Sequence, residues 1–69
     1  AELILALDRA LEKLGELDDR LARVFDCRYF AGLTPQETAD ALDISLRTAQ
    51  RDWSKSKAWL RRELSAGSI

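Results

Sequence analysis

Residues 33–64 read LTPQETADALDISLRTAQRDWSKSKAWLRREL, and this stretch decides the fold. Its start carries Thr34 and Glu37 at the spacing of a capping box, in which each side chain satisfies a backbone N–H of the other residue. Pro35 suits the first helical position, where the missing N–H costs nothing. The pattern therefore predicts a short helix over 35–42.

A longer helix follows after a tight turn. Asp43 and Ile44 make the turn, and Ser45 is a suitable N-cap for a helix over 46–64. The small side chain of Ala39 allows the two helices to cross closely. Two helices joined in this way are typical of the helix-turn-helix, a motif that lays its second helix in the major groove of DNA.

Two further helices are expected before this motif. Apolar residues recur at spacings of three and four over 2–14, and Gly15 is a plausible stop after them. Asp18 is a suitable N-cap for a second helix over 19–30, with Leu17 as a hydrophobic staple. No strand-like alternation of useful length occurs. The sequence predicts an all-α fold in which four helices form one domain over residues 1–69.

Composition favours binding over catalysis. The 69 residues include no histidine and one cysteine, and no glycine-rich loop is present. We therefore expect no enzyme, no cofactor and no metal site, and Cys27 is interpreted as a packed thiol. A single cysteine and the lack of a membrane-spanning run indicate the cytoplasm. Ala1 leads straight into helical sequence, which suggests a piece of a longer protein.

The net charge of −1 conceals a strong separation of charge. Residues 1–19 carry six acids against two bases, whereas residues 45–64 carry six bases against two acids. The acidic segment is expected to repel nucleic acid and to lie away from it, free for a protein partner. The basic segment is suited to hold nucleic acid.

The basic residues of the predicted helix 46–64 share one side. At about 100° per residue, its six cations lie opposite an apolar stripe. Asp52 and Glu63 fall between the two faces, so no acid interrupts the basic one. The stripe consists of Leu46, Ala49, Trp53, Leu60 and Leu64, with small Ser56.

Such a face has alternative interpretations. Many amphipathic surface helices carry solvated charges without binding anything. The basic helix also suits a protein-interaction module with an acidic partner, and four helices are found in the DNA-binding output domains of response regulators. The combination of a capped short helix, a tight turn and an uninterrupted basic face favours DNA binding.

Three segments carry a more specific resemblance: RYFAGLTPQETADALDIS at 28–45, TAQRDW at 48–53 and WLRREL at 59–64. Together they resemble region 4 of bacterial sigma factors, most closely of the extracytoplasmic-function type. The resemblance implies a domain that recognises the −35 promoter element and docks on the flap of the RNA polymerase β subunit. An anti-sigma factor is a further candidate partner, and no membrane is expected.

The resemblance also implies a set of DNA-binding residues. The positions that match groove-facing or phosphate-near residues of the family are Arg28, Gln36, Arg47, Thr48, Gln50, Arg51, Ser54 and Lys55. Arginine and glutamine side chains can each give two hydrogen bonds to a base, and lysine holds phosphate as a point charge. The sequence departs from the commoner family pattern at Ala49 and Gln50, where valine followed by a basic residue is frequent.

Overall fold

The chain folds into helices, as the sequence predicts. The structure, a computed structural model, describes the backbone of residues 2–67 and the side chains of residues 2 and 4–65. Within these residues no strand occurs, and the all-α prediction is confirmed. The elements are α1 (Glu2–Leu17), α2 (Asp19–Phe25) with its π-helical continuation η1 (Asp26–Phe30), α3 (Pro35–Leu42) and α4 (Leu46–Gly67).

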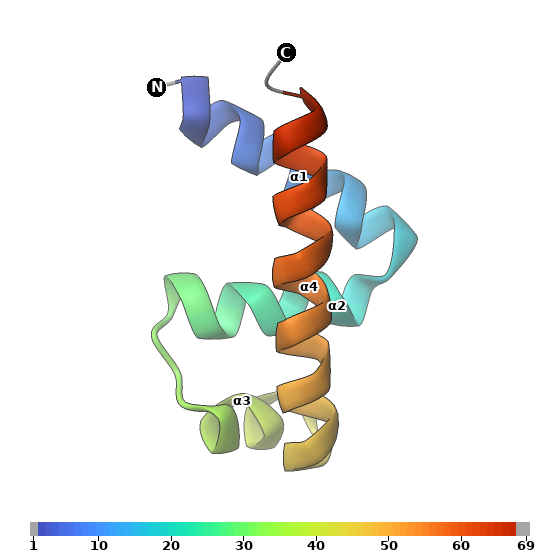
Figure 1. Ribbon diagram of the computed structural model, residues 1–69. Coiled ribbons are helices and arrows are strands. Elements are labelled where there is room, and N and C mark those ends of the chain that lie inside the picture. Colours follow the sequence, from blue (N-terminus) through green and yellow to red (C-terminus); the bar gives the residue numbers. More distant parts are fainter. Residues whose placement is uncertain (1, 68–69) are drawn as a thin grey trace.

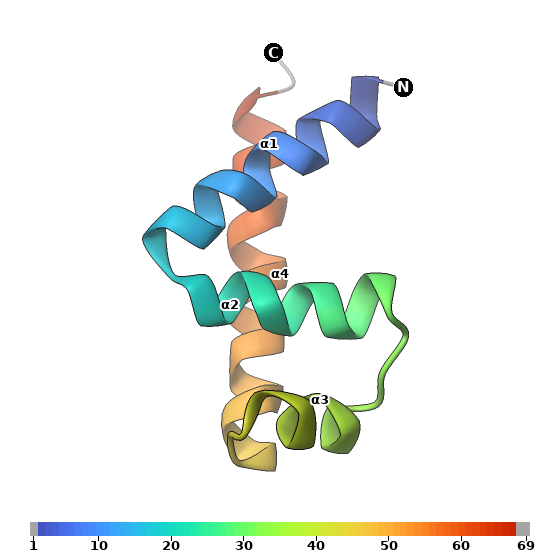
Figure 2. The same ribbon diagram turned by 180° about the vertical axis from the view of Figure 1, so that it is seen from behind.

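The long helix α4 is the axis around which the others are arranged. Figure 1 shows α1 and α2 passing behind α4 and α3 lying beside its first turns, and Figure 2 shows the same order from behind. All three shorter helices contact α4 directly. Helix α3 and the first turns of α4 therefore lie at one end of the molecule, and α1 lies toward the other.

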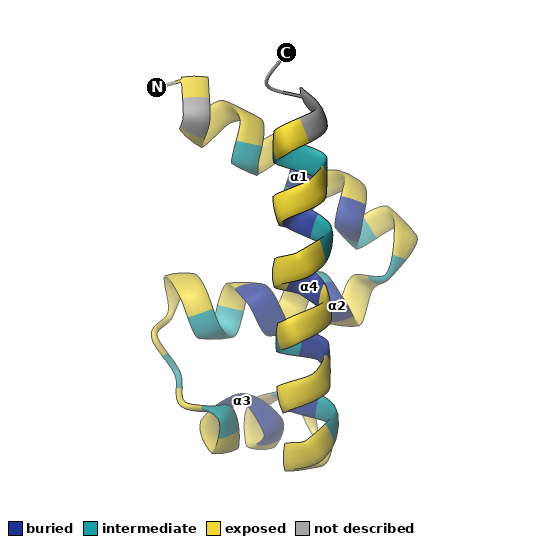
Figure 3. Cartoon of the chain, viewed as in Figure 1, coloured by how far each residue is buried: buried dark blue, intermediate teal, exposed yellow. Residues whose placement is uncertain are grey.

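The core lies where α1, α2 and α4 meet. Burial of apolar surface at this junction is the main term that stabilises so small a fold. Figure 3 shows buried segments on α1, α2 and α4, and mostly exposed segments on the side of α4 nearest the viewer over its described residues. The central buried cluster consists of Ala10, Leu14, Leu21, Phe25 and Leu60.

The end of α1 differs from the prediction. Helix α1 continues through Gly15 to Leu17, and Gly15 lies where α1 approaches α2, since a Cβ there would stand 3.7 Å from the Cβ of Ala22. The glycine thus belongs to a helix contact and is not a stop. Asp18 is the N-cap of α2 as predicted, since its carboxylate accepts from the N–H of Leu21. The staple is wrong, because Leu17 is exposed.

The predicted helix over 19–30 has the right span but two hydrogen-bond patterns. From Asp26 onward the chain is π-helical, and the N–H of Ala31 donates to the carbonyl of Asp26, five residues back. The segment ends at Phe30, and Gly32, two residues later, has a left-handed φ of 69°. The wider turn carries the ring of Tyr29 onto Phe25, with ring centroids 5.1 Å apart.

Candidate nucleic-acid interface

The turn between α3 and α4 is fixed by local hydrogen bonds. The N–H of Glu37 donates to Thr34 Oγ1 over 3.1 Å, and the N–H of Thr34 donates to Glu37 Oε1 over 2.8 Å, so the predicted capping box is confirmed. Asp43 takes the left-handed conformation, with a φ of 56°. The N–H of Ile44 then donates to the carbonyl of Ala39. These contacts close α3 and redirect the chain into α4.

Ser45 begins α4 as predicted. Its Oγ accepts from the N–H of Thr48 over 3.0 Å and also donates to Thr48 Oγ1. Thr48 is half-buried and occupied by this cap. Thr48, one of the predicted site residues, therefore lies beside the exposed face of α4 and not on it.

Five of the predicted site residues share the exposed face of α4. They are Arg47, Gln50, Arg51, Ser54 and Lys55, and all of them are exposed. The ion pairs found among the described residues are formed by other side chains, so the three cations of this group remain available to a ligand. Arginine, glutamine and lysine on one helical face offer donors for base edges and phosphates.

The buried face of α4 differs from the predicted apolar stripe. Its buried residues are Ala49, Asp52, Ser56 and Leu60. Trp53 is only half-buried, and Leu46 is 39% exposed. At about 100° per residue, the centre of the buried face lies about 40° from the centre of the predicted stripe, with small Ser56 counted in that stripe. The difference arises because Asp52, assigned by sequence to the border, faces inward.

An ion pair between α2 and α4 accounts for the inward position of Asp52. Arg20 Nε donates to Asp52 Oδ2 over 2.5 Å, and Nη2 lies 3.4 Å from Oδ1. The Asp52 side chain is 2% exposed and that of Arg20 is 50% exposed. The hydrogen bond and the charge of Asp52 raise the pKa of Arg20 above its ordinary value. The sequence analysis missed this pair, although an acid bordering the apolar stripe is a signal for it.

Arg28 lies apart from the α4 group and has protein partners. Its Nη1 donates to the carbonyl of Leu33, and its guanidinium stands 5.1 Å from the centre of the Trp53 ring. Lys57 Nζ lies 4.8 Å from the same ring. The cation–π contact and the hydrogen bond tie the loop between η1 and α3 to α4. These contacts leave Arg28 less freedom to reach phosphate than the cations on the exposed face of α4.

Gln36 is exposed near the start of α3. Its Nε2 donates to Asp40 Oδ1 over 3.0 Å, which holds the amide along the surface of α3. The side chain thus belongs to the first helix of the motif and not to the group on α4.

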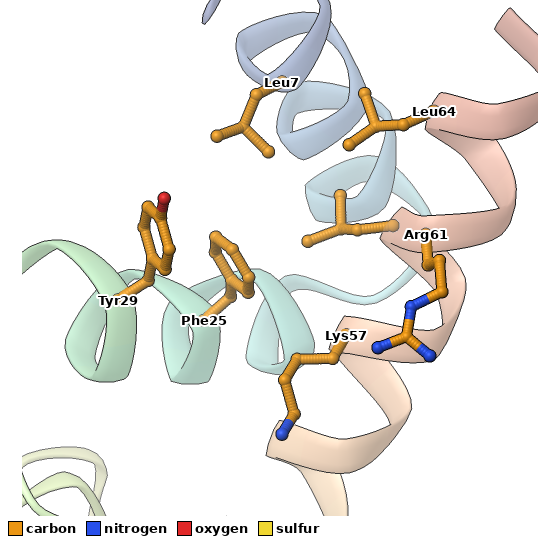
Figure 4. A pocket seen from close by; sticks show the side chains of 7 residues that line it. Leu7, Phe25, Tyr29, Lys57, Arg61 and Leu64 are labelled. Carbon is orange, nitrogen blue, oxygen red and sulfur yellow. The ribbon is translucent and has the colours of Figure 1, made fainter. Parts of the chain in front are cut away.

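A groove of about 360 Å³ opens between α1, α2, η1 and α4. Figure 4 shows the side chains of Leu7, Phe25, Tyr29 and Leu64 converging on it, with Lys57 and Arg61 extending from α4 at its edge. Tyr29 is 60% exposed beside it, and the neighbouring Phe30 is 58% exposed. The sequence analysis did not identify this groove, because its residues come from four separate segments.

Comparison with protein families tests the assignment. A family model described as ECF sigma factor matches residues 1–66. The chain belongs to the ECF sigma factor family. The match covers every described helix except the last residue of α4 and decides against the response-regulator alternative. The comparisons found no matching curated protein and no matching solved structure.

Membership in the ECF sigma factor family implies a role in transcription initiation, with RNA polymerase and promoter DNA as partners. Sigma factors are not enzymes, so the prediction that the chain is not an enzyme is confirmed. Among the described residues, no three His, Cys, Asp or Glu side chains gather as a metal site would require. None of the helices in the described part has the length and apolar composition of a membrane span.

Proposed function

We propose that this ECF sigma factor chain is region 4 and that α4 recognises the −35 promoter element. The observation that carries the proposal is the exposed row of Gln50, Arg51 and Ser54 on the second helix of a helix-turn-helix. The first turns of α4 stand at the end of the molecule where α3 lies (Figure 1), which is where such a helix enters a groove.

The geometry suggests different roles for the members of the α4 face. The outward direction, opposite the buried residues, falls between Gln50 and Arg51, so both are suited to base edges. Lys55 lies about 75° from that direction at about 100° per residue and Gln50 about 65° on the other side, so the angle alone does not separate them. Lys55 is assigned to phosphate because its ammonium is a point charge, and Arg47 because it stands at the start of the helix. Thr48 and Gln36 flank the group and are proposed to contact the backbone of the DNA. Arg28 is proposed to hold the loop before α3, and a phosphate contact by this residue stays a prediction.

The test is promoter binding by RNA polymerase reconstituted with the full-length sigma factor. Arg51→Ala is expected to cost roughly 1–3 kcal/mol on the matched −35 element and much less on a scrambled one. Lys55→Ala is expected to weaken both about equally and to lower the salt slope by about one. If both variants change the affinities for the matched and the scrambled −35 element identically, Arg51 does not recognise the base sequence.

A matched control comes from the same helix. Arg62 is exposed and carries the same charge as Arg51, but it lies 11 residues later, about 16 Å along the axis. Arg62→Ala is therefore expected to leave the matched-to-scrambled ratio unchanged. An equal loss of discrimination by Arg62→Ala would show that net charge, and not the position of Arg51, sets the ratio.

A second surface supports a role in holding the polymerase. We propose that the groove between α1, α2, η1 and α4 docks the flap of the β subunit, or an anti-sigma factor that competes with it. An apolar groove with exposed aromatic residues is typical of a protein interface. Tyr29→Ser is expected to weaken capture of core polymerase, whereas Leu5→Ser, an exposed apolar change on α1, is the control. Equal capture of core polymerase by both variants would exclude the groove as the docking site.

A further inference from the structure

The most unusual side chain of α4 is Asp52. Its carboxylate is 2% exposed on a helix that carries six cations and one other acid, Glu63. Burial of a carboxylate is costly unless it is paired, and removal of its partner leaves that cost uncompensated. Arg20 of α2 supplies both hydrogen bonds to Asp52 that the structure shows from another helix.

The apolar residues of α4 favour a different rotation of the helix. Together with small Ser56, they place the centre of the buried face about 40° around the helix axis from its position in the structure, at about 100° per residue. In that orientation Trp53 points into the core and Asp52 moves toward water. Arg51 then points straight outward, and Gln50 turns to the side. The structure has instead Asp52 inside and Trp53 half-buried.

We infer that Arg20 is a positioning residue, which sets the rotation of α4 by holding Asp52 inward. The pair selects the orientation in which Gln50 and Arg51 lie on either side of the outward direction. Its effect on DNA rests on the proposed function, whereas its effect on the helix does not. Arg20 lies on α2, remote in sequence from the DNA-facing group, and acts through Asp52.

The rotation has a spectroscopic signature that does not depend on DNA. In a Trp59→Phe background, Trp53 is the remaining tryptophan of the chain, and iodide quenching of its fluorescence measures its exposure. Arg20→Met leaves Asp52 unpaired, so α4 is expected to turn and Trp53 to become less accessible to iodide. Simple loosening of the fold would make it more accessible. Unchanged or increased quenching in folded Arg20→Met therefore overturns the inference.

Two further variants sharpen the result. Arg23→Met removes the same charge from the same helix, but Arg23 forms an exposed pair with Asp19, so quenching is expected to stay at the starting value. If circular dichroism shows that Arg20→Met is unfolded, Arg20→Gln carries the same test. Glutamine keeps one donor toward Asp52 and removes the charge, so a smaller decrease in quenching is expected, and an increase or no change overturns the inference.

A second substitution that restores discrimination distinguishes a positioning role of Arg20 from a direct contact between Arg20 and DNA. In promoter binding by the reconstituted polymerase, Arg20→Met is expected to reduce matched-to-scrambled discrimination by about 5- to 150-fold, the range for losing one bidentate base contact. In the double variant Arg20→Met/Asp52→Leu, the apolar side chain at position 52 favours the inward orientation. Discrimination and iodide quenching are therefore expected to return to the values of the unmodified protein. Failure of the double variant to regain both overturns the inference. If the unmodified protein shows no discrimination, the proposed function fails, and the quenching experiment still decides the role of Arg20.

Discussion

Two glycines in this chain are predicted to respond in opposite ways to the same substitution. Gly15 lies inside α1, and a Cβ added there meets the Cβ of Ala22 at 3.7 Å, an ordinary contact distance. Alanine in place of a helical glycine stabilises by roughly 0.5–1 kcal/mol, and a half-buried methyl group adds a few tenths more. Gly15→Ala should therefore raise the free energy of unfolding by about 1 kcal/mol, or Tm by about 4–8 °C.

Gly32 is the matched control. No heavy atom lies within 4 Å of a Cβ added at Gly32, so space is available, but its φ of 69° is left-handed. An L-residue pays roughly 1–2 kcal/mol in that conformation, and Gly32→Ala should lower Tm. Calorimetry on both variants provides the measurement. A fall in Tm for Gly15→Ala, or a shift of the same sign at both positions, would refute the argument from helix continuity and backbone conformation.

Three further predictions concern the core, the acidic segment and pH. Trp53 packs on Phe25 with ring centroids 5.5 Å apart. Trp53→Ala should lower the free energy of unfolding, measured in urea, by about 3 kcal/mol, the lower end for aromatic truncation because the ring is only half-buried. Glutamine at Glu12 and Glu16 should leave affinity for the matched −35 element unchanged in the polymerase assay, and a large loss of specificity would contradict the position of α1 away from DNA. Partial desolvation raises the pKa of the exposed Asp26 side chain in the folded chain, so its charged form slightly opposes folding above that pKa and the penalty fades as the pH falls through it. Asp26→Asn should therefore raise Tm near neutral pH and lose this advantage toward about pH 4; a constant difference across that range would contradict it.

The helix-turn-helix was predictable because its signals are local. The capping box at Thr34 and Glu37 and the cap at Ser45 each join residues three apart, so the sequence contains both partners. The end of α1 was not predictable in this way. A glycine inside a helix and a glycine that ends one are the same letter in the sequence, and the neighbour of Gly15 in the fold, Ala22, lies on another helix.

The same limit applies to the candidate site. The identity of the exposed residues on α4 follows from periodicity, and the structure places Arg47, Gln50, Arg51, Ser54 and Lys55 together on one face. The direction in which these side chains point does not follow from periodicity, because periodicity places the buried face by the apolar residues and does not predict a buried acid. An inward aspartate requires a partner, and Arg20 is 32 residues away in the sequence.

Both acids near the basic face of α4 are attached to other helices. Asp52 pairs with Arg20 of α2, and Glu63 Oε1 lies 2.8 Å from Lys13 Nζ of α1. The Lys13–Glu63 pair is solvent-exposed and contributes at most about 1 kcal/mol to stability. Its greater consequence is electrostatic, because each acid is neutralised by a cation from elsewhere and leaves the cations of α4 uncompensated. The acids thus fix α4 to α1 and α2 on one side and leave the positive field on the other side undiminished, as the proposed contact with a phosphate backbone requires.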